Sequence, residues 1–444
     1  KLWQDEDHDT LSDNRVILTM NDQIAKDVVL DEEDIPADPE GLGFPVMGTG
    51  EHAIQLIDMR TDANGDPLPY DDPLWDDFLD QLTYEDLSKI CAIGLRMTVG
   101  VQSVGKPETL DHNGPSGMTQ PYGNGQNGYA VINNDPDKDS TGTCYPCNGI
   151  IAATFNDRLA EEIGELIGED CMWAGYAGLY GTGINIHRTP YSGRVFEYFS
   201  EDGILTGLTA AKVSAGIQSK GVYVYNKHFV INDQENKRAG LGTWTTEQAL
   251  REIYLRAFEL PIIYADAKCV MSSFNRIGAN WSATSYELMT EWLRGEAGMT
   301  GFAVTDMFDT QYMSKPHEVL AGNDIPDGFP GRVDKTTKLS SISDDVLLAE
   351  FAPYGPNGTT PSAAMAWAMR ESAHRVMYTV VHSRGMDGIS EGSQIVTLTP
   401  WWQTAINTGK WVFGVLTVLA AALMVQDMVK RRKESCKKTA DDRN

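Results

Sequence analysis

Residues 200–230 read SEDGILTGLTAAKVSAGIQSKGVYVYNKHFV, and this stretch decides the fold class. The apolar residues of 200–221 recur at helical spacing, so this part is predicted to be a helix. Residues 222–230 form a short run rich in valine and aromatic residues, which predicts a buried strand. A helix followed directly by a buried strand is the repeating unit of a parallel α/β sheet.

The same unit recurs on both sides of this stretch. Predicted helices and the strands that follow them lie at 155–172 and 178–186, 245–263 and 267–275, and 285–298 and 301–309. A further amphipathic helix begins at Leu74, and Thr83 with Asp86 resembles a capping box for the next one. This number of units predicts a TIM-type (β/α)8 barrel. A doubly wound sheet is the second alternative, but no G-x-G-x-x-G follows a strand.

Polar side chains stand at the end of each predicted strand. They are Asn185, His187 and Arg188, then Lys227 and His228, then Ser272, Ser273 and Asn275, and finally Asp306. The carboxyl ends of barrel strands converge on one face, where active sites are built. The sequence therefore predicts an active site that contains Asp306, Lys227 and His228.

Four blocks of sequence resemble the signature blocks of glycoside hydrolase family 3. They are GINIHRTPYSGRVFEYFSED (183–202), YNKHFVINDQENKR (225–238), MSSFNR (271–276) and GFAVTDMFD (301–309). The resemblance runs from about Leu74 to Gly388. It includes HNGPSG at 112–117 and AGND at 321–324. The ends of the chain are similar to a permuted branch of that family, which has a C-terminal barrel and a membrane anchor after a TPWWQTA-like segment, here 399–405.

The resemblance implies a retaining β-glycosidase of the β-glucosidase or β-xylosidase type. Asp306 matches the nucleophile that forms a glycosyl-enzyme, and nearby cations would keep it ionised. The implied substrate-binding residues are Asn113, Arg194, Lys227, His228, Met271, Phe274 and Met307. The implied substrate is a short β-linked oligosaccharide or glycoside.

Three of these positions depart from the family pattern. Asn113 stands where the family has an aspartate, which removes a charge-assisted bond to the sugar. Phe274 replaces a tyrosine and Met307 replaces a tryptophan. These changes leave open an alternative, a catalytically weakened sugar-binding relative.

The general acid is expected to lie outside this chain. In the family it comes from a sandwich domain, which in the permuted order would precede Lys1. Glu201, Asp233 and Glu235 are carboxylates near the motifs, but the resemblance supports none of them as the acid. The hexosaminidase branch carries a K-H-F-P-G-H-G loop, whereas this chain has K-H-F-V-I-N-D-Q-E, so that substrate class is disfavoured.

An uncharged apolar run, WVFGVLTVLAAALMV, occupies 411–425, and KRRK follows at 430–433. With its flanks it reaches about the 20 residues that a bilayer core needs. The basic cluster predicts a single-pass cell-membrane protein with a cytoplasmic tail and an extracellular barrel. The formal net charge of −27 makes nucleic acid an improbable partner, so the predicted partners are a glycoside and the lipid bilayer.

These observations together predict the domain organisation. The segments are an acidic N-terminal segment and linker at 1–73, the barrel at 74–388, a linker at 389–403, the transmembrane helix at 404–429 and the basic tail at 430–444. No cofactor or metal is predicted: Cys144 and Cys147 lack a second C-x-x-C, and the aspartates of DPDKDS (135–140) lack the remaining ligands of a calcium loop.

Overall fold

The computed structural model describes residues 38–50, 53–118, 143–236, 238–307, 312–328, 362–396 and 401–441. The chain divides into two compact units, residues 1–395 and 396–444. The first unit is an α/β structure and contains every predicted site residue. The acidic DPDKDS segment and residues 1–37 lie outside the described residues.

A seven-stranded sheet in the order β1-β2-β3-β4-β6-β9-β10 forms the centre of the first unit. Its strands from β2 to β10 run parallel, and the short β1 pairs antiparallel with β2. The strands are β1 Met97–Thr98, β2 Thr109–Asn113, β3 Gly178–Gly183, β4 Tyr223–Phe229, β6 Cys269–Ser272, β9 Ala303–Met307 and β10 Ile325–Asp327. The prediction of an α/β fold with parallel strands is therefore confirmed.

The described strands form a curled, open sheet rather than a closed eight-stranded barrel, with β1 and β10 at its two edges. The curl brings the edges together without strand pairing between them. Asp327 of β10 accepts a hydrogen bond from the backbone N–H of Arg96, the residue before β1, at 3.2 Å. The Tyr180 hydroxyl of β3 donates to the same carboxylate at 3.3 Å. A side-chain seam thus takes the place of a ladder between the two edges.

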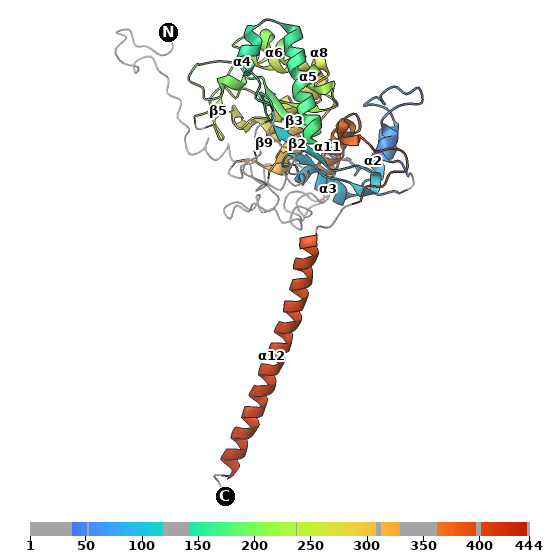
Figure 1. Cartoon of the computed structure of the whole chain (residues 1–444), viewed down its shortest axis with the longest axis vertical. Coiled ribbons are helices and arrows are strands. Elements are labelled where there is room, and N and C mark those ends of the chain that lie inside the picture. Colours follow the sequence, from blue (N-terminus) through green and yellow to red (C-terminus); the bar gives the residue numbers. More distant parts are fainter. Residues whose placement is uncertain are drawn as a thin grey trace, which may run out of the picture. The chain divides into compact units, whose positions relative to one another are not determined.

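Helices cover the sheet. Figure 1 shows α4, α5, α6 and α8 grouped together, and α2, α3 and α11 in a second group. The α-helices of the first unit are α2 Leu74–Asp80, α3 Tyr84–Ala92, α4 Asn148–Ala153, α5 Asp157–Ala174, α6 Gly203–Gln218, α7 Glu247–Ala249, α8 Arg256–Ala265, α9 Lys315–Ala321 and α11 Ala363–Val381. Thr83 and Asp86 form the predicted capping box at the start of α3.

Shorter elements complete the first unit. A small sheet has the order β5-β7-β8, with β5 Gly242–Thr243, β7 Arg276–Ile277 and β8 Asn280–Trp281. The predicted helix at 245–263 is divided into α7, the π-helix η6 at Leu250–Leu255, and α8. A second π-helix, η8, spans Glu287–Glu296, and single 3₁₀ turns are η2 Leu56–Met59, η3 Gln102–Val104, η5 Val195–Glu197, η7 Ser282–Thr284 and η10 Arg384–Met386.

Glycines allow α5 and α6 to approach closely. A Cβ atom on Gly164 of α5 would lie 2.2 Å from the Val213 carbonyl oxygen of α6, and one on Gly216 of α6 would lie 2.2 Å from the Glu161 carbonyl oxygen. No side chain fits at either position, because real Cβ contacts do not approach so closely. The two helices therefore pack with their backbones in close contact where they cover the sheet.

The core lies on both faces of the sheet, and β4 shows why. Its apolar side chains are divided between two clusters: Tyr223 and Tyr225 belong to one, and Val224 and Phe229 to the other. Every residue of β4 is buried, as expected for a parallel strand covered on both faces. The polar pair Lys227 and His228 at the end of β4 is consequently buried too and needs polar partners.

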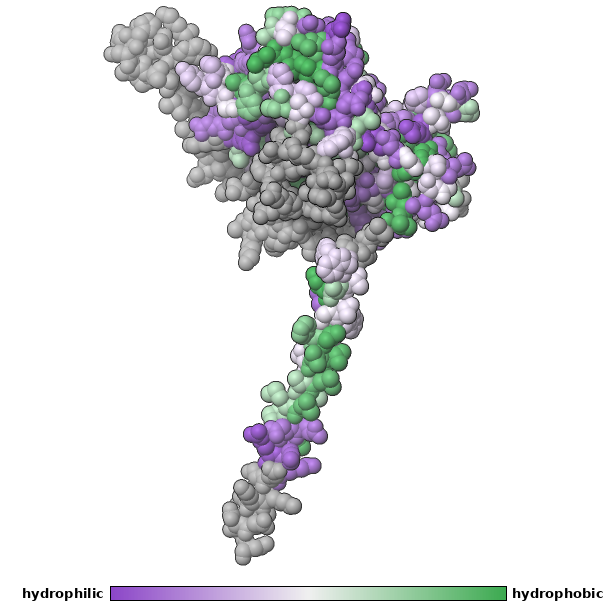
Figure 2. Space-filling view, in the orientation of Figure 1, coloured by the Kyte–Doolittle hydropathy of each residue, from purple (hydrophilic) through white to green (hydrophobic). Residues whose placement is uncertain are grey.

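The second unit is the helix α12, Trp401–Asp441. Its segment Thr404–Lys433 is long and apolar enough to cross a membrane, with a mean hydropathy of 2.0 over its most apolar window. Figure 2 shows hydrophobic side chains along this helix, followed by a hydrophilic segment. The predicted apolar helix and its basic end are therefore present.

Candidate active site

The carboxyl ends of β4 and β9 bring three of the predicted site residues together. Lys227 and His228 end β4, and Asp306 is the penultimate residue of β9. β6 separates the two strands in the sheet. His228 Nε2 lies 3.5 Å from Asp306 Oδ2. The convergence that the strand-end pattern predicted is thus present in the structure for these residues.

Asp306 presents one unused carboxylate oxygen. Its Oδ1 accepts a hydrogen bond from the backbone N–H of Met307 at 2.8 Å, which fixes the orientation of the carboxylate. Its Oδ2 is buried and has no hydrogen-bond partner among the described residues. A buried carboxylate oxygen without a donor is costly in a folded protein, and at a functional site it is the atom available for chemistry.

His228 is held as a neutral imidazole. Asn185 fixes its backbone, accepting from its N–H at 2.7 Å and donating to its carbonyl at 2.9 Å. Burial lowers the pKa of His228 well below its usual value, and the charges of Arg194 and Lys227 lower it further. Arg194 Nη2 lies 2.8 Å from His228 Nε2. A guanidinium can only donate, so Nε2 is the acceptor, and the contact with Asp306 is not an ion pair.

Arg194 is the central cation of the site. It lies just before η5, and its Nη2 also donates to Glu197 Oε1 at 2.5 Å. Its Nη1 lies 3.6 Å from Glu235 Oε1. The Arg194 side chain is 18 % exposed, so these contacts are only weakly screened by solvent. The guanidinium is therefore fixed between two carboxylates, with His228 as its third neighbour.

Lys227 and Asn113 form a second polar pair. Lys227 Nζ donates to Asn113 Oδ1 at 2.8 Å, which joins the end of β4 to the end of β2. Burial lowers the pKa of Lys227 to about 8, while the nearby charges of Glu197 and Asp306 oppose this shift. Most of the lysine is therefore still protonated at neutral pH. The amide at position 113 thus accepts from a cation, a role that does not require a carboxylate.

The three remaining predicted site residues have different surroundings. Met271 is buried in the same apolar cluster as Tyr225 and Val304. Phe274 is buried in a small cluster with Trp281, and the guanidinium of Arg238 lies 4.4 Å from its ring centroid. Met307, at the end of β9, is half exposed. Of these three side chains, only Met307 presents a sizeable exposed surface.

Several residues of this site were not predicted from the sequence. Glu197 follows Arg194 by three positions, a spacing that places side chains on neighbouring positions of a helical turn and could have indicated the pair. Tyr198 and Asn232 also belong to the site, because Asn232 Nδ2 donates hydrogen bonds to the Tyr198 hydroxyl and to Glu235. Asp327 ends β10 opposite Met307. Burial and, more weakly, the charge of Asp306 raise the pKa of Asp327 to about 7.

The carboxylates that were left open as proton donors differ in their surroundings. Glu201 is exposed at the surface. Asp233 is largely buried, and this burial raises its pKa to about 7, while Arg188 and the Tyr254 hydroxyl act in the opposite direction. Glu235 lies in the site, with both carboxylate oxygens close to guanidinium groups. Among the described residues, no group of three or more His, Cys, Asp or Glu is arranged to hold a metal ion.

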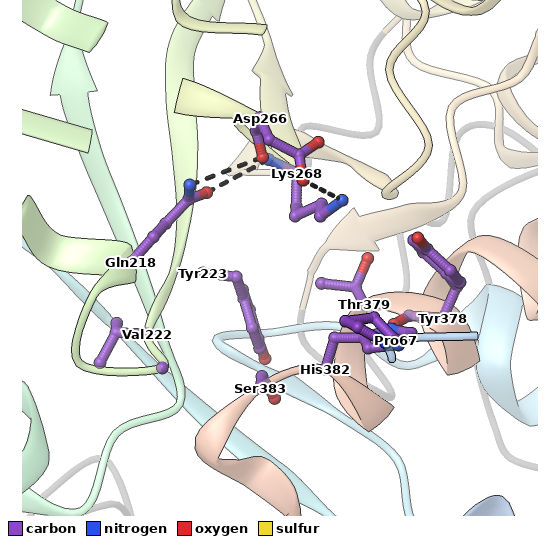
Figure 3. A pocket seen from close by; sticks show the side chains of 11 residues that line it. Pro67, Gln218, Val222, Tyr223, Asp266, Lys268, Tyr378, Thr379, His382 and Ser383 are labelled. Carbon is purple, nitrogen blue, oxygen red and sulfur yellow. Dashed lines mark hydrogen bonds and ion pairs between the residues drawn. The ribbon is translucent and has the colours of Figure 1, made fainter. Parts of the chain in front are cut away.

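A separate cavity of about 260 Å³ lies at the opposite ends of the strands, before β4 and β6 begin. Figure 3 shows Lys268 on its wall with the ion pair to Asp266, and Tyr223, Tyr378 and His382 around it. Its polar groups are bonded within the chain: both His382 ring nitrogens, for example, lie 2.9–3.1 Å from backbone carbonyl oxygens. This cavity takes no part in the site of Asp306.

Residues 137–322 match the model of the glycosyl hydrolase family 3 N terminal domain. This part of the chain is similar to a family 3 domain. Asp306, His228, Lys227 and Arg194 all lie within the matched residues, whereas Asn113 precedes them and Asp327 follows them. The four residues at the centre of the site thus lie in the part of the chain that is similar to the family model.

Curated proteins that are similar to this part of the chain are named β-glucosidases. A probable β-glucosidase I of Aspergillus oryzae is 38 % identical over 229 residues, which are 51 % of this chain and 26 % of the relative. β-Glucosidase A of Butyrivibrio fibrisolvens is 33 % identical over 260 residues, 57 % of this chain and 29 % of the relative. The chain therefore spans between about a quarter and a third of the length of these relatives.

Solved structures agree with the sequence relatives. β-Glucosidase 3B from Thermotoga neapolitana in complex with glucose has a TM-score of 0.59 and 28 % sequence identity, over 70 % of this chain and 43 % of that chain. The Bifidobacterium adolescentis GH3 β-glucosidase has a TM-score of 0.54 and 28 % identity, over 72 % of this chain and 42 % of that chain. The first unit thus resembles β-glucosidases in both sequence and fold.

Proposed function

We propose that this chain is the catalytic domain of a retaining β-glycosidase that acts on short β-linked glucosides or xylosides. The observation that carries the proposal is the free Oδ2 of Asp306, which lies beside a neutral histidine and a fixed arginine. The similarity to β-glucosidases supports the substrate class.

In the proposed first step, Asp306 Oδ2 attacks the anomeric carbon of the sugar. The C–O bond to the leaving group breaks, and a glycosyl-enzyme ester forms. Water then attacks the same carbon, releases the sugar with net retention, and frees the carboxylate. Arg194 and Lys227 stabilise the ionised Asp306 before attack, and with His228 and Asn113 they offer hydrogen bonds to sugar hydroxyls.

The leaving group needs a proton, and we propose that a separate domain supplies the proton donor. Glu197 and Glu235 accept from Arg194 or Arg238, so both are already engaged in holding guanidinium groups. The resemblance to the permuted branch implies a sandwich domain before the barrel as the source. The greater length of the curated relatives is consistent with such a domain.

A sugar-binding relative with weakened activity is the second candidate. It is favoured by Asn113, which lacks the charge for a strong bond to a sugar hydroxyl, and by Met307, which lacks an aromatic face. Hydrolysis of an aryl β-glucoside by the full chain in detergent separates the two. We expect release of the aryl alcohol and of β-glucose as the first sugar product, observed by proton NMR. Glucose binding without turnover would favour the weakened relative instead.

We further propose that α12 anchors the domain in the cell membrane with the catalytic domain outside. Deletion of residues 400–444 is expected to move the protein from the membrane pellet to the soluble fraction. The paired substitution Leu416→Arg with Leu419→Arg should do the same, because a charged residue at the centre of a span costs about 2.5–3.5 kcal/mol. Western blots of carbonate-washed membranes measure the distribution.

The matched control for this membrane experiment changes charges after the apolar run. Lys437→Ala with Lys438→Ala leaves that run intact, and this variant should stay in the pellet. If the deleted chain also stays in the pellet, α12 is not the anchor. Protease added outside intact cells should cut the catalytic domain, and protection of that domain would contradict the proposed orientation.

A further inference from the structure

Glu235 is a partly buried carboxylate at the edge of the site, in the loop that follows β4. Its Oε2 accepts from Arg238 Nη1 at 2.9 Å, and its Oε1 accepts from Asn232 Nδ2 at 3.0 Å. The same Oε1 lies 3.6 Å from Arg194 Nη1. The side chain is only 17 % exposed, so it is a fixed part of the structure rather than a surface charge.

These contacts are part of a closed ring of side-chain contacts that includes His228. Asn232 Nδ2 donates to the Tyr198 hydroxyl at 3.0 Å as well as to Glu235. The Tyr198 hydroxyl lies 3.4 Å from His228 Nδ1, and His228 Nε2 accepts from Arg194. The contact between Arg194 Nη1 and Glu235 Oε1 completes the ring. The ring therefore joins the η5 segment, the end of β4 and the loop after it.

The ring determines how Arg194 is oriented. A guanidinium is planar, and its terminal nitrogens form a rigid fork. Glu197 engages Nη2 and Glu235 engages Nη1, so the fork is held from two sides. With Glu235 absent, Nη1 would lose its described carboxylate neighbour and the plane could turn about the remaining contact. His228 Nε2 and the charge beside Asp306 would then move with it.

We propose that Glu235 is a positioning residue that acts through Arg194, holding Arg194 and His228 in place beside Asp306. This inference rests on the proposed glycosidase function for its kinetic test. Glu235 does not touch the reacting atoms in this role and does not exchange a proton with the substrate. The proposal thereby assigns a structural purpose to a carboxylate that also stood as a candidate proton donor.

The test compares Glu235→Ala and Glu235→Gln with the full wild-type chain on two substrates. One is 2,4-dinitrophenyl β-glucoside, whose leaving group departs with little protonation of its oxygen. The other is methyl β-glucoside, whose leaving group departs only when its oxygen is protonated. Displacement of Arg194 should lower kcat/KM about 10- to 100-fold on both substrates, because small misplacements have effects of this size. The ratio of the two rates should stay the same as in the wild-type chain, and added azide should give no more glycosyl azide than it gives with the wild-type chain. Glu235→Gln should retain more activity than Glu235→Ala, since its amide oxygen can still accept.

A double-mutant cycle shows whether Glu235 acts through Arg194. In an Arg194→Ala background, Glu235→Ala should lower kcat/KM by less than about threefold, because the group it positions is gone. Glu201→Gln is the matched control: it removes an exposed carboxylate close in sequence and should leave the rates unchanged. The melting temperature of each variant is measured alongside the rates.

Several results would overturn the inference. A selective loss on methyl β-glucoside with rescue by azide would make Glu235 a proton donor. An undiminished effect in the Arg194→Ala background would show that it does not act through Arg194. Absence of wild-type turnover on both substrates would instead contradict the proposed function. In that case the same variants are tested by calorimetry with gluconolactone, where Glu235→Ala should weaken binding and Glu201→Gln should not.

Discussion

Asp306→Asn is expected to lower kcat on an aryl β-glucoside by at least about 10³-fold, because loss of a catalytic nucleophile typically has effects of several orders of magnitude. The amide cannot form the glycosyl-enzyme ester. The fold should survive, since Asp306 lies at a strand end and, in the described part of the chain, its Oδ2 has no hydrogen-bond partner to lose. Initial rates and far-ultraviolet circular dichroism measure the two expectations.

Asp266→Asn is the matched control for this substitution. Asp266 is an exposed carboxylate before β6, at the far ends of the strands, and its left-handed backbone (φ 48°) suits asparagine. This variant should keep the wild-type rate. A 2-fluoro glycoside should trap the glycosyl-enzyme, and peptide mass spectrometry should find the label on Asp306. A label on Asp327 or any other carboxylate would remove Asp306 from the role of nucleophile.

A second large effect is expected in the choice of leaving group. The chain should hydrolyse 2,4-dinitrophenyl β-glucoside far better than cellobiose, because a proton donor contributes about 10²–10⁴-fold for poor leaving groups. Both carboxylates beside Arg194 are held by guanidinium groups, and retaining chemistry requires a donor about 5–5.5 Å from the nucleophile. The measured quantity is the ratio of kcat/KM on the two substrates.

The comparison for this ratio is a full-length relative, β-glucosidase 3B from Thermotoga neapolitana. The ratio for this chain should exceed that of the relative by about 10²-fold or more, the lower end of a typical donor contribution. Equal ratios would place a working proton donor within this chain. Asp233 and Asp327, with pKa values raised to about 7, would then be the first carboxylates to replace.

Much of the fold followed from local patterns. The parallel strands could be predicted because strands buried on both faces read as short apolar runs between amphipathic helices, as in β4. The proximity of Asp306 and His228 followed from the convergence of strand ends, without knowledge of any long-range contact. Patterns of this kind indicate which side chains each segment buries and where each strand ends. This was sufficient to place Asp306 and His228 at the same end of the sheet.

Other features depend on contacts between segments far apart in the chain, which no local pattern contains. The seam between Arg96 and Asp327 joins residues 231 positions apart, so the open sheet was not foreseen. Phe274 was predicted to bind substrate from its motif position, and its burial against Trp281 and Arg238 could not be read from that motif. Glu197 is the exception, because its spacing from Arg194 was visible in the sequence.

The open sheet also bears on the solubility of the first unit. An unpaired edge strand is a template on which another chain can add a strand and begin aggregation. Here the described edges are short: β1 has two residues, and β10 has three, with Pro326 in the middle. Proline has no N–H to donate, so β10 presents an interrupted row of donors. The two edges thus resist edge-to-edge assembly by their brevity and composition, a protection that a closed barrel would obtain from its geometry.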